Sequence, residues 1–235
     1  MKTNRTLRAR IKKKTAKRSL LMMKQPEKNS DSRKIILSKL RGSVSRAWEQ
    51  NWPDEVPEGD VFPRITNLLN AFKEELEGLG GEVFVEKSEA EALVRLQKLA
   101  SHRNWGPVAV VNRALKEKCL KNNIEVTDFD PETGVFEAGL TGCEALIALT
   151  GSVMVSSNGS GRKMNVFPPV HVVLAHSDQV VESIKDGFKK IEEKYDHLPS
   201  QISLISGPSR TADIEKTLVM GAHGPRELIV LVQEE

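Results

Sequence analysis

The chain has 235 residues, of which 39% are hydrophobic and only two are cysteines. This length allows one large domain with its own core, whereas two cysteines are too few for an iron–sulfur cluster or structural zinc site held by this chain alone. No apolar run is long enough to span a membrane and no secretory segment is present, so we expect a cytoplasmic protein.

Positive charge is concentrated at the N-terminus. Residues 1–24 hold ten of the 35 Lys and Arg residues and none of the 32 acids, although the net charge is only +3. Because the rest of the chain is acidic, a nucleic-acid partner is not expected. We expect residues 1–30 to form a basic, disordered tail and residues 31–235 to form a single domain. The first 24 residues are a real tail, a targeting segment, or an artefact of a start site at Met22 or Met23.

The first half of the body predicts alternating helices and strands. An amphipathic helix, with Ser30 and Asp31 as candidate caps, extends to Trp48, and a proline-rich linker follows. The expected elements after this linker are helices at 65–80, 88–103 and 113–123 and strands at 82–86, 107–111 and 124–129. This order is typical of an α/β fold with a mostly parallel sheet flanked by helices.

The second half departs from this alternation. We expect a short helix at 144–148, strands at 151–157 and 169–175 around a Gly/Ser loop, a helix capped by Ser177 at 177–195, and strands at 201–205 and 227–233. Two strands joined by a glycine-rich loop indicate an antiparallel or split element in the sheet.

Polar residues gather in "ISGPSRTADIEKTLVMG", directly after the predicted strand 201–205. Ligands in open α/β sheets bind beyond the carboxyl ends of strands. We expect Asp213 to cap a short helix that stops at Gly221, with Arg210 beside it as a bidentate partner for a carboxylate or phosphate. The alternative is that Ser209, Thr211 and Asp213 only cap the helix, while Arg210 pairs with Asp213 or Glu215.

Three further segments carry candidate residues. "GAHGPRE" places His223 in a tight turn, where it is a site residue or a structural one bonded to a carbonyl, and adds Arg226 as a second anion ligand. "SSNGSGRK" is a weak nucleotide motif because Met164 replaces the third glycine, but it carries Arg162. His171 and His176 lie five apart on a predicted strand, so they face opposite sides and do not form a zinc site.

"SGPSRTADIE" followed by "GAHGPREL" closely resembles the C-terminal signature of the LUD-domain family, of the lactate utilization protein C type. The upstream "TGSVMV", the Arg162 loop and "PPVHVVLA" are similar to the preceding segments of that family. The resemblance covers roughly Ser32 to the C-terminus.

The resemblance implies a fold similar to ribose-5-phosphate isomerase and the CoA transferases. It also implies a role in a system that oxidises L-lactate to pyruvate, with iron–sulfur clusters on partner subunits and no cofactor on this chain. Family members often carry an acid before the middle Thr-Gly, where this chain has Leu149. This departure argues against a carboxylate mechanism there, including the glutamate thioester route.

We therefore expect a non-cluster subunit of an L-lactate-oxidising complex, which binds a small carboxylate or supports assembly. The alternative is a freestanding enzyme acting on a phosphorylated or CoA-linked metabolite; whether this chain performs chemistry stays open. The expected ligand-binding residues are Thr150, Gly151, Arg162, Ser206, Gly207, Ser209, Arg210, Thr211, His223 and Arg226. The candidate acids or bases are Asp213, Glu215 and His223, and no metal ligands are expected.

Overall fold

A computed structural model describes residues 28–48, 64–132, 134–212 and 218–234. Its contacts divide the chain into two units, Met1–Val61 and Phe62–Glu235. The first unit contains helix α2 (Lys28–Trp48), as predicted, but the helix begins before Ser30 and Asp31, so these residues are not its caps. In its described stretch α2 exposes four large apolar side chains, Ile35, Ile36, Leu37 and Leu40. The expected division between a tail and a single domain stays a prediction.

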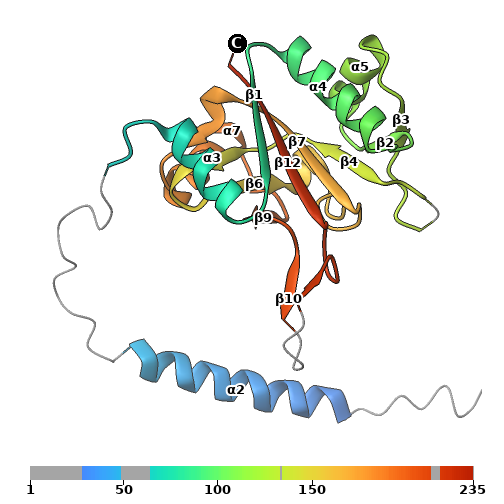
Figure 1. The fold of residues 1–235 in the computed structure, drawn as a ribbon. Helices are drawn as coiled ribbons and strands as arrows, with labels where there is room; N and C mark the ends of the chain where they lie inside the picture. The colour runs from blue at the N-terminus through green and yellow to red at the C-terminus, as the bar shows by residue number, and fades with distance from the viewer. Residues whose placement is uncertain (1–27, 49–63, 133, 213–217, 235) are drawn as a thin grey trace, which may run out of the picture. The chain divides into compact units, whose positions relative to one another are not determined.

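A six-stranded parallel sheet forms the centre of the second unit (Figure 1). Its strands are β1 (Glu82–Glu86), β2 (Val108–Val110), β3 (Val126–Asp128), β4 (Ala138–Thr141), β7 (Val170–His176) and β12 (Glu227–Gln233). They lie in the order β1-β12-β7-β4-β2-β3, and every described pair is parallel. The predicted α/β class with a mostly parallel, helix-flanked sheet is therefore confirmed.

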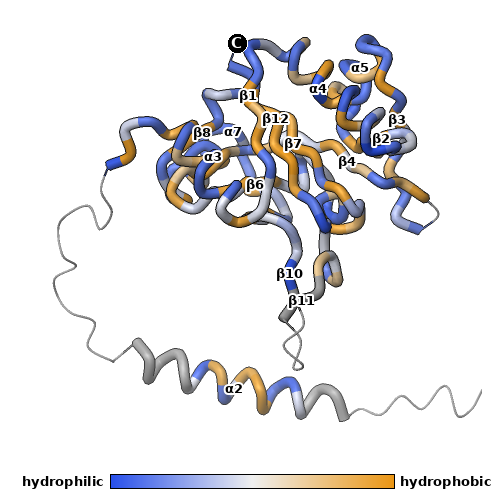
Figure 2. Tube along the Cα trace, in the orientation of Figure 1, coloured by the Kyte–Doolittle hydropathy of each residue, from blue (hydrophilic) through white to orange (hydrophobic). Residues whose placement is uncertain are grey.

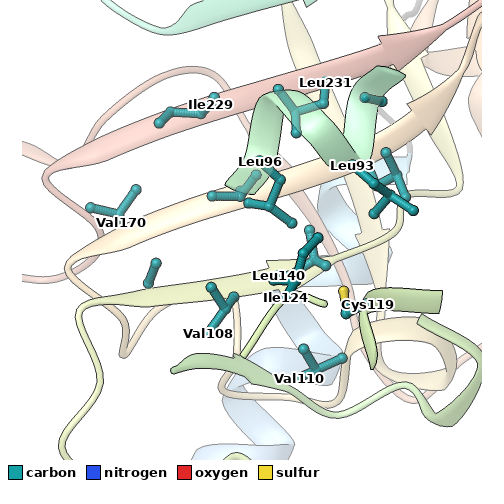
Figure 3. Packing of buried hydrophobic residues seen from close by; sticks show 14 residues of the cluster. Leu93, Leu96, Val108, Val110, Cys119, Ile124, Leu140, Val170, Ile229 and Leu231 are labelled. Atoms are coloured by element: carbon teal, nitrogen blue, oxygen red, sulfur yellow. The ribbon is translucent and has the colours of Figure 1, made fainter. Parts of the chain in front are cut away.

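Three helices of the first half pack on this sheet: α3 (Leu68–Gly78), α4 (Glu89–His102) and α5 (Arg113–Lys121). Each begins after a side-chain cap, since Asn67, Ser88 and Asn112 accept a hydrogen bond from a backbone N–H three residues on. Residues of α4 and α5 cover one face of the sheet, where Leu93, Leu96 and Cys119 pack with strand residues (Figure 3).

A second, four-stranded sheet lies beyond the other face. It contains β5 (Ala145–Ile147), β6 (Ser152–Ser156), β8 (Val180–Val181) and β9 (Ile202–Ile205), in the order β8-β5-β6-β9. Only β5 and β8 are parallel within it. One core cluster joins this sheet and α3 to the six-stranded sheet, and another joins it to α7 (Ile184–Lys194). Short helices η1 (Ala148–Thr150), α6 (Ser157–Ser160) and η2 (Ser177–Gln179) connect these strands.

Three of the predicted helices are wrong in whole or in part. The segment 144–148 contains β5, because Ala145–Ile147 is a short apolar run buried on both faces, which periodicity cannot distinguish from a helix. The helix expected from Ser177 begins at Ile184, after a capping box between Ser183 and Asp186. The segment predicted as a helix ending at Gly221 instead contributes β11 (Leu218–Met220), which pairs antiparallel with β10 (Arg210–Ala212).

Candidate functional site

Two loops at the open end of the β10–β11 hairpin are joined through their backbones. The Ser209 amide donates to the Pro225 carbonyl at 2.8 Å, and the Gly221 amide donates to the Ser209 carbonyl at 2.9 Å. A Cβ atom at Gly224 would lie 3.2 Å from the Ser209 Cβ, so the loops also pack closely. We call these segments the joined loops, residues 206–210 and 221–226.

The joined loops lie at a different edge of the sheet than predicted. Residues 221–226 lead into the amino end of β12, and the Arg226 amide donates to the Pro169 carbonyl just before β7. Residues 206–210 leave β9, which belongs to the four-stranded sheet. The expectation of a site beyond the carboxyl ends of the parallel strands is therefore wrong for these loops, because the chain enters the second sheet before it reaches them.

A chain of hydroxyl groups joins the middle motif to the first loop. The Ser152 Oγ lies 2.7 Å from the Thr150 Oγ1 and 2.6 Å from the Ser206 Oγ. Ser152 is only 2% exposed, so its hydroxyl depends on these partners rather than on water. The structure thus brings the predicted residues Thr150 and Ser206 together through Ser152, which the sequence reasoning did not select.

The end of α3 supports the same cluster. Gly151 has φ +56°, and a Cβ atom there would lie 2.7 Å from the Glu75 carbonyl carbon. Gly207 has φ +101°, with its Cβ position 3.0 Å from the Leu79 carbonyl oxygen. Both positions therefore favour glycine for conformation and for space.

Arg210 is anchored to the same carbonyl. Its Nη2 donates a hydrogen bond to the Leu79 oxygen, while the residue as a whole is exposed. A Cβ atom at Gly80 would lie 2.5 Å from that Nη2, so glycine leaves room for the guanidinium. Guanidinium carries five N–H donors, and no acidic partner of Arg210 appears among the residues that the structure describes.

The remaining predicted residues are placed unevenly. His223 and Arg226 are exposed in the second of the joined loops. Arg162 is exposed on a separate loop, and across the described ranges no printed contact joins its guanidinium to the joined loops, although its carbonyl accepts a bond from Gln201. Thr211 belongs to β10. Asp213 and Glu215 lie outside the described residues, so their pairing with Arg210 stays untested.

Two buried polar groups lie outside the set of predicted site residues. The His171 Nε2 lies 2.8 Å from the Thr141 Oγ1, and burial lowers the pKa of His171 to about 4, which keeps the ring neutral. His176 lies, half-buried, at the carboxyl end of the same strand beside Asp178, so the two histidines do not meet, as predicted.

Glu144 is the second of these groups. Burial alone would raise its pKa, but hydrogen bonds from Lys194, Ser156 and Tyr195 outweigh burial and lower the pKa. These groups tie Glu144 to the end of α7 and to the start of α6, and none of them belongs to the joined loops.

Within the described ranges, no group of three or more His, Cys, Asp or Glu side chains is arranged to hold a metal ion. Burial raises the pKa of Cys119 to about 11 and that of Cys143 to about 12, so both thiols stay protonated at neutral pH. The expectation that this chain carries no cluster stays a prediction. A cavity of about 310 Å³ lies between the ends of α4 and α5, and none of the predicted site residues lines it.

Comparison with known proteins identifies the family. Residues 69–232 match the LUD domain. The chain is 29% identical over 212 residues to lactate utilization protein C of Anoxybacillus flavithermus. The matched region covers 84% of this chain and 95% of that protein. It is 31% identical over 153 residues to an uncharacterized protein of Neisseria meningitidis, covering 64% of this chain and 65% of that protein.

The fold has a solved counterpart as well. A DUF162 family protein from Deinococcus radiodurans superposes with a TM-score of 0.51 at 21% identity, covering 70% of this chain and 95% of that chain. No helix in the described ranges combines the length and the apolar character that a membrane crossing needs.

Because the family match extends over residues 69–232, the chain belongs to the LUD-domain family, and its sequence is similar to relatives of the lactate utilization protein C type.

Proposed function

We propose that this chain takes part in lactate utilization as a cytoplasmic, non-cluster subunit of an L-lactate-oxidising system, and that it binds a small carboxylate at the joined loops. The observation that carries the proposal is the match to lactate utilization protein C of A. flavithermus, which extends over 95% of that protein. A match over nearly the whole relative supports a shared role better than a match confined to one motif.

The geometry of the joined loops supports the carboxylate. Arg210 and Arg226 are exposed on the two loops, and one N–H of Arg210 is fixed on the Leu79 carbonyl. An anchored guanidinium presents its remaining donors in a fixed direction, which suits bidentate contact with a carboxylate. His223, in the same turn as Arg226, is a further donor or acceptor for such a ligand.

The role of partner subunits rests on chemistry. Oxidation of L-lactate to pyruvate releases two electrons, which need a redox acceptor. Two buried, protonated cysteines do not supply one, so the proposal assigns iron–sulfur clusters to partner subunits. The alternative of a freestanding enzyme for a phosphorylated or CoA-linked metabolite is not favoured by the relatives' names.

The experiment is a gene deletion in the native organism, with growth on L-lactate as the sole carbon source and on glucose as the control. The proposal predicts loss of growth on lactate alone, with restoration by the full-length gene. Mass spectrometry of proteins that co-purify with the tagged chain should identify cysteine-rich iron–sulfur proteins. Normal growth of the deletion strain on lactate would overturn the proposed role, and co-purification without such proteins would overturn the subunit assignment.

A further inference from the structure

Strand β9 forms one edge of the four-stranded sheet. The sheet order is β8-β5-β6-β9, and β6 is the strand with which β9 pairs in the described part of the chain. An edge strand presents a row of unpaired N–H and C=O groups, which proteins usually protect with charged residues, proline or a covering element. The four residues of β9, Ile202–Ile205, include no charged residue and no proline.

The register identifies which backbone groups of β9 face outward. The Ser157 amide donates to the Gln201 carbonyl at 2.9 Å, at the position that continues the β6–β9 register. Directly opposed residues in an antiparallel ladder alternate between bonded and non-bonded pairs. Ser203 therefore bonds toward β6, whereas Ile202 and Leu204 point their N–H and C=O groups away from the sheet.

This outward pattern is complementary to itself. Ile202 and Leu204 lie symmetrically about Ser203, so an antiparallel copy of β9 with a two-fold axis at Ser203 would pair Ile202 with Leu204 of the second copy. We propose that β9 pairs in this way with β9 of a second copy of this chain, which joins two four-stranded sheets into one continuous eight-stranded sheet. The interface is isologous, as expected for a two-fold dimer.

The side chains of β9 favour the same partner. Leu204 is 41% exposed and lies opposite Met154, whose side chain packs toward α7. In the dimer, Ile202 of the second copy becomes its direct cross-strand neighbour and covers part of this apolar surface. Because β9 is uncharged, its pairing brings no like charges of the strand itself together.

The edge strand β1 of the larger sheet gives a contrast. It carries Glu82 and Glu86 at its two ends, and Lys87 follows it. Charges at these positions oppose pairing with another strand. The distribution of charge therefore disfavours β1 as the contact between copies, whereas β9 carries no such charge.

The proposed dimer does not depend on a role of this chain in lactate utilization. Because β9 runs directly into Ser206, pairing in the dimer would hold the strand that enters the joined loops. Lactate binding and dimer formation nevertheless have separate readouts.

The test combines sedimentation with paired cysteine variants of the full chain. Sedimentation velocity across a wide concentration range should show a dimer of the wild type. Ser203→Cys should form a disulfide-linked dimer on mild oxidation, because opposed residues of a non-bonded pair have Cα atoms about 4.5 Å apart. Leu204→Cys is the control, since its own counterpart lies diagonally at about 7–8 Å, beyond the usual disulfide reach of about 7 Å.

Leu204→Pro gives an independent readout. It removes the outward N–H while leaving the bonds of β9 to β6, since proline is accepted at such edge positions. The variant should sediment as a monomer with an unchanged melting temperature. A wild type that is monomeric at every concentration would overturn the proposal, and so would equal cross-linking of the two cysteine variants. If Leu204→Pro does not fold, the comparison of cross-linking in Ser203→Cys and Leu204→Cys decides whether β9 forms the contact.

Discussion

The central strands and the joined loops are held in place by different interactions. Strands β7 and β12 are hydrophobic along most of their length (Figure 2) and are almost completely buried. The joined loops are held instead by backbone hydrogen bonds, a chain of hydroxyl groups and glycines packed against the end of α3. Substitutions in the core and substitutions in the joined loops should therefore separate effects on stability from effects on ligand binding, because most of the buried apolar surface lies away from the loops.

The largest loss of stability is expected in the core of the parallel sheet. Leu231 of β12 is fully buried between β12 and α4, so Leu231→Ala should lower the free energy of unfolding by about 2–5 kcal/mol. Urea denaturation measures the change. Leu120→Ala is the matched control, because Leu120 is an exposed residue of α5, and a similar loss in both variants would contradict the assignment of the core.

The buried histidine should make this core sensitive to pH. The unfolded chain takes up a proton at His171 as the pH falls below the ordinary value of 6.5, whereas the folded chain does so only near its lowered pKa of about 4. The free energy of unfolding should therefore decrease by on the order of 3 kcal/mol as the pH is lowered from 6.5 to about 4.

The effect is measured by urea denaturation across this pH window. His171→Gln should flatten the dependence, while His197→Gln, at an exposed position, should follow the wild type. A wild-type stability that is constant through the window would contradict the burial of a neutral ring.

A smaller loss is expected where the loops meet α3. Gly151→Ala places a side chain at φ +56° and against the backbone of Glu75, so it should destabilise the protein by at least about 1–2 kcal/mol. Gly78→Ala, in α3 itself, is the control, because a Cβ atom there meets nothing within 4 Å. It should be neutral or slightly stabilising. Equal melting temperatures of the two variants would show that the contact does not require glycine.

Local patterns explain which parts of the fold could be predicted. Strands β1 and β12 were predicted at their exact bounds, because each is an apolar run between clear turn signals. Strand β4 was missed, since its four residues include Gly139, which packs against Pro168 and Met164 and carries no strand signal. The segment of β11 is predicted as part of a helix because Asp213 is a typical local cap, whereas the pairing of β11 with β10 is a non-local property.

The site was predictable only in its parts. The motifs identified the joined loops, but the contacts of Ser209 with Gly221 and Pro225 follow from the β10–β11 hairpin, where the sequence pattern predicted a helix. Ser152 gave no signal of its own in the sequence, since a lone serine in a strand is common. Its role follows from its position between Thr150 and Ser206.

The smallest effect on stability, and the largest on function, is expected at Arg210. Its bond to the Leu79 carbonyl should contribute only about 1 kcal/mol to folding, whereas lysine cannot reproduce bidentate contact with a carboxylate. Arg210→Lys and Arg210→Ala should therefore both fold, and neither should support growth of the deletion strain on lactate. Arg113→Ala, which removes an exposed arginine paired with Glu117, should support normal growth.

The measurement that tests the carboxylate site most directly is the growth rate on L-lactate of the deletion strain carrying Arg210→Lys, alongside the melting temperature of the purified variant. The site predicts a melting temperature close to that of the wild type together with abolished growth on lactate and normal growth on glucose. Wild-type growth on lactate from stably folded Arg210→Lys and Arg210→Ala would contradict it, and would leave the bond to Leu79 as the role of Arg210.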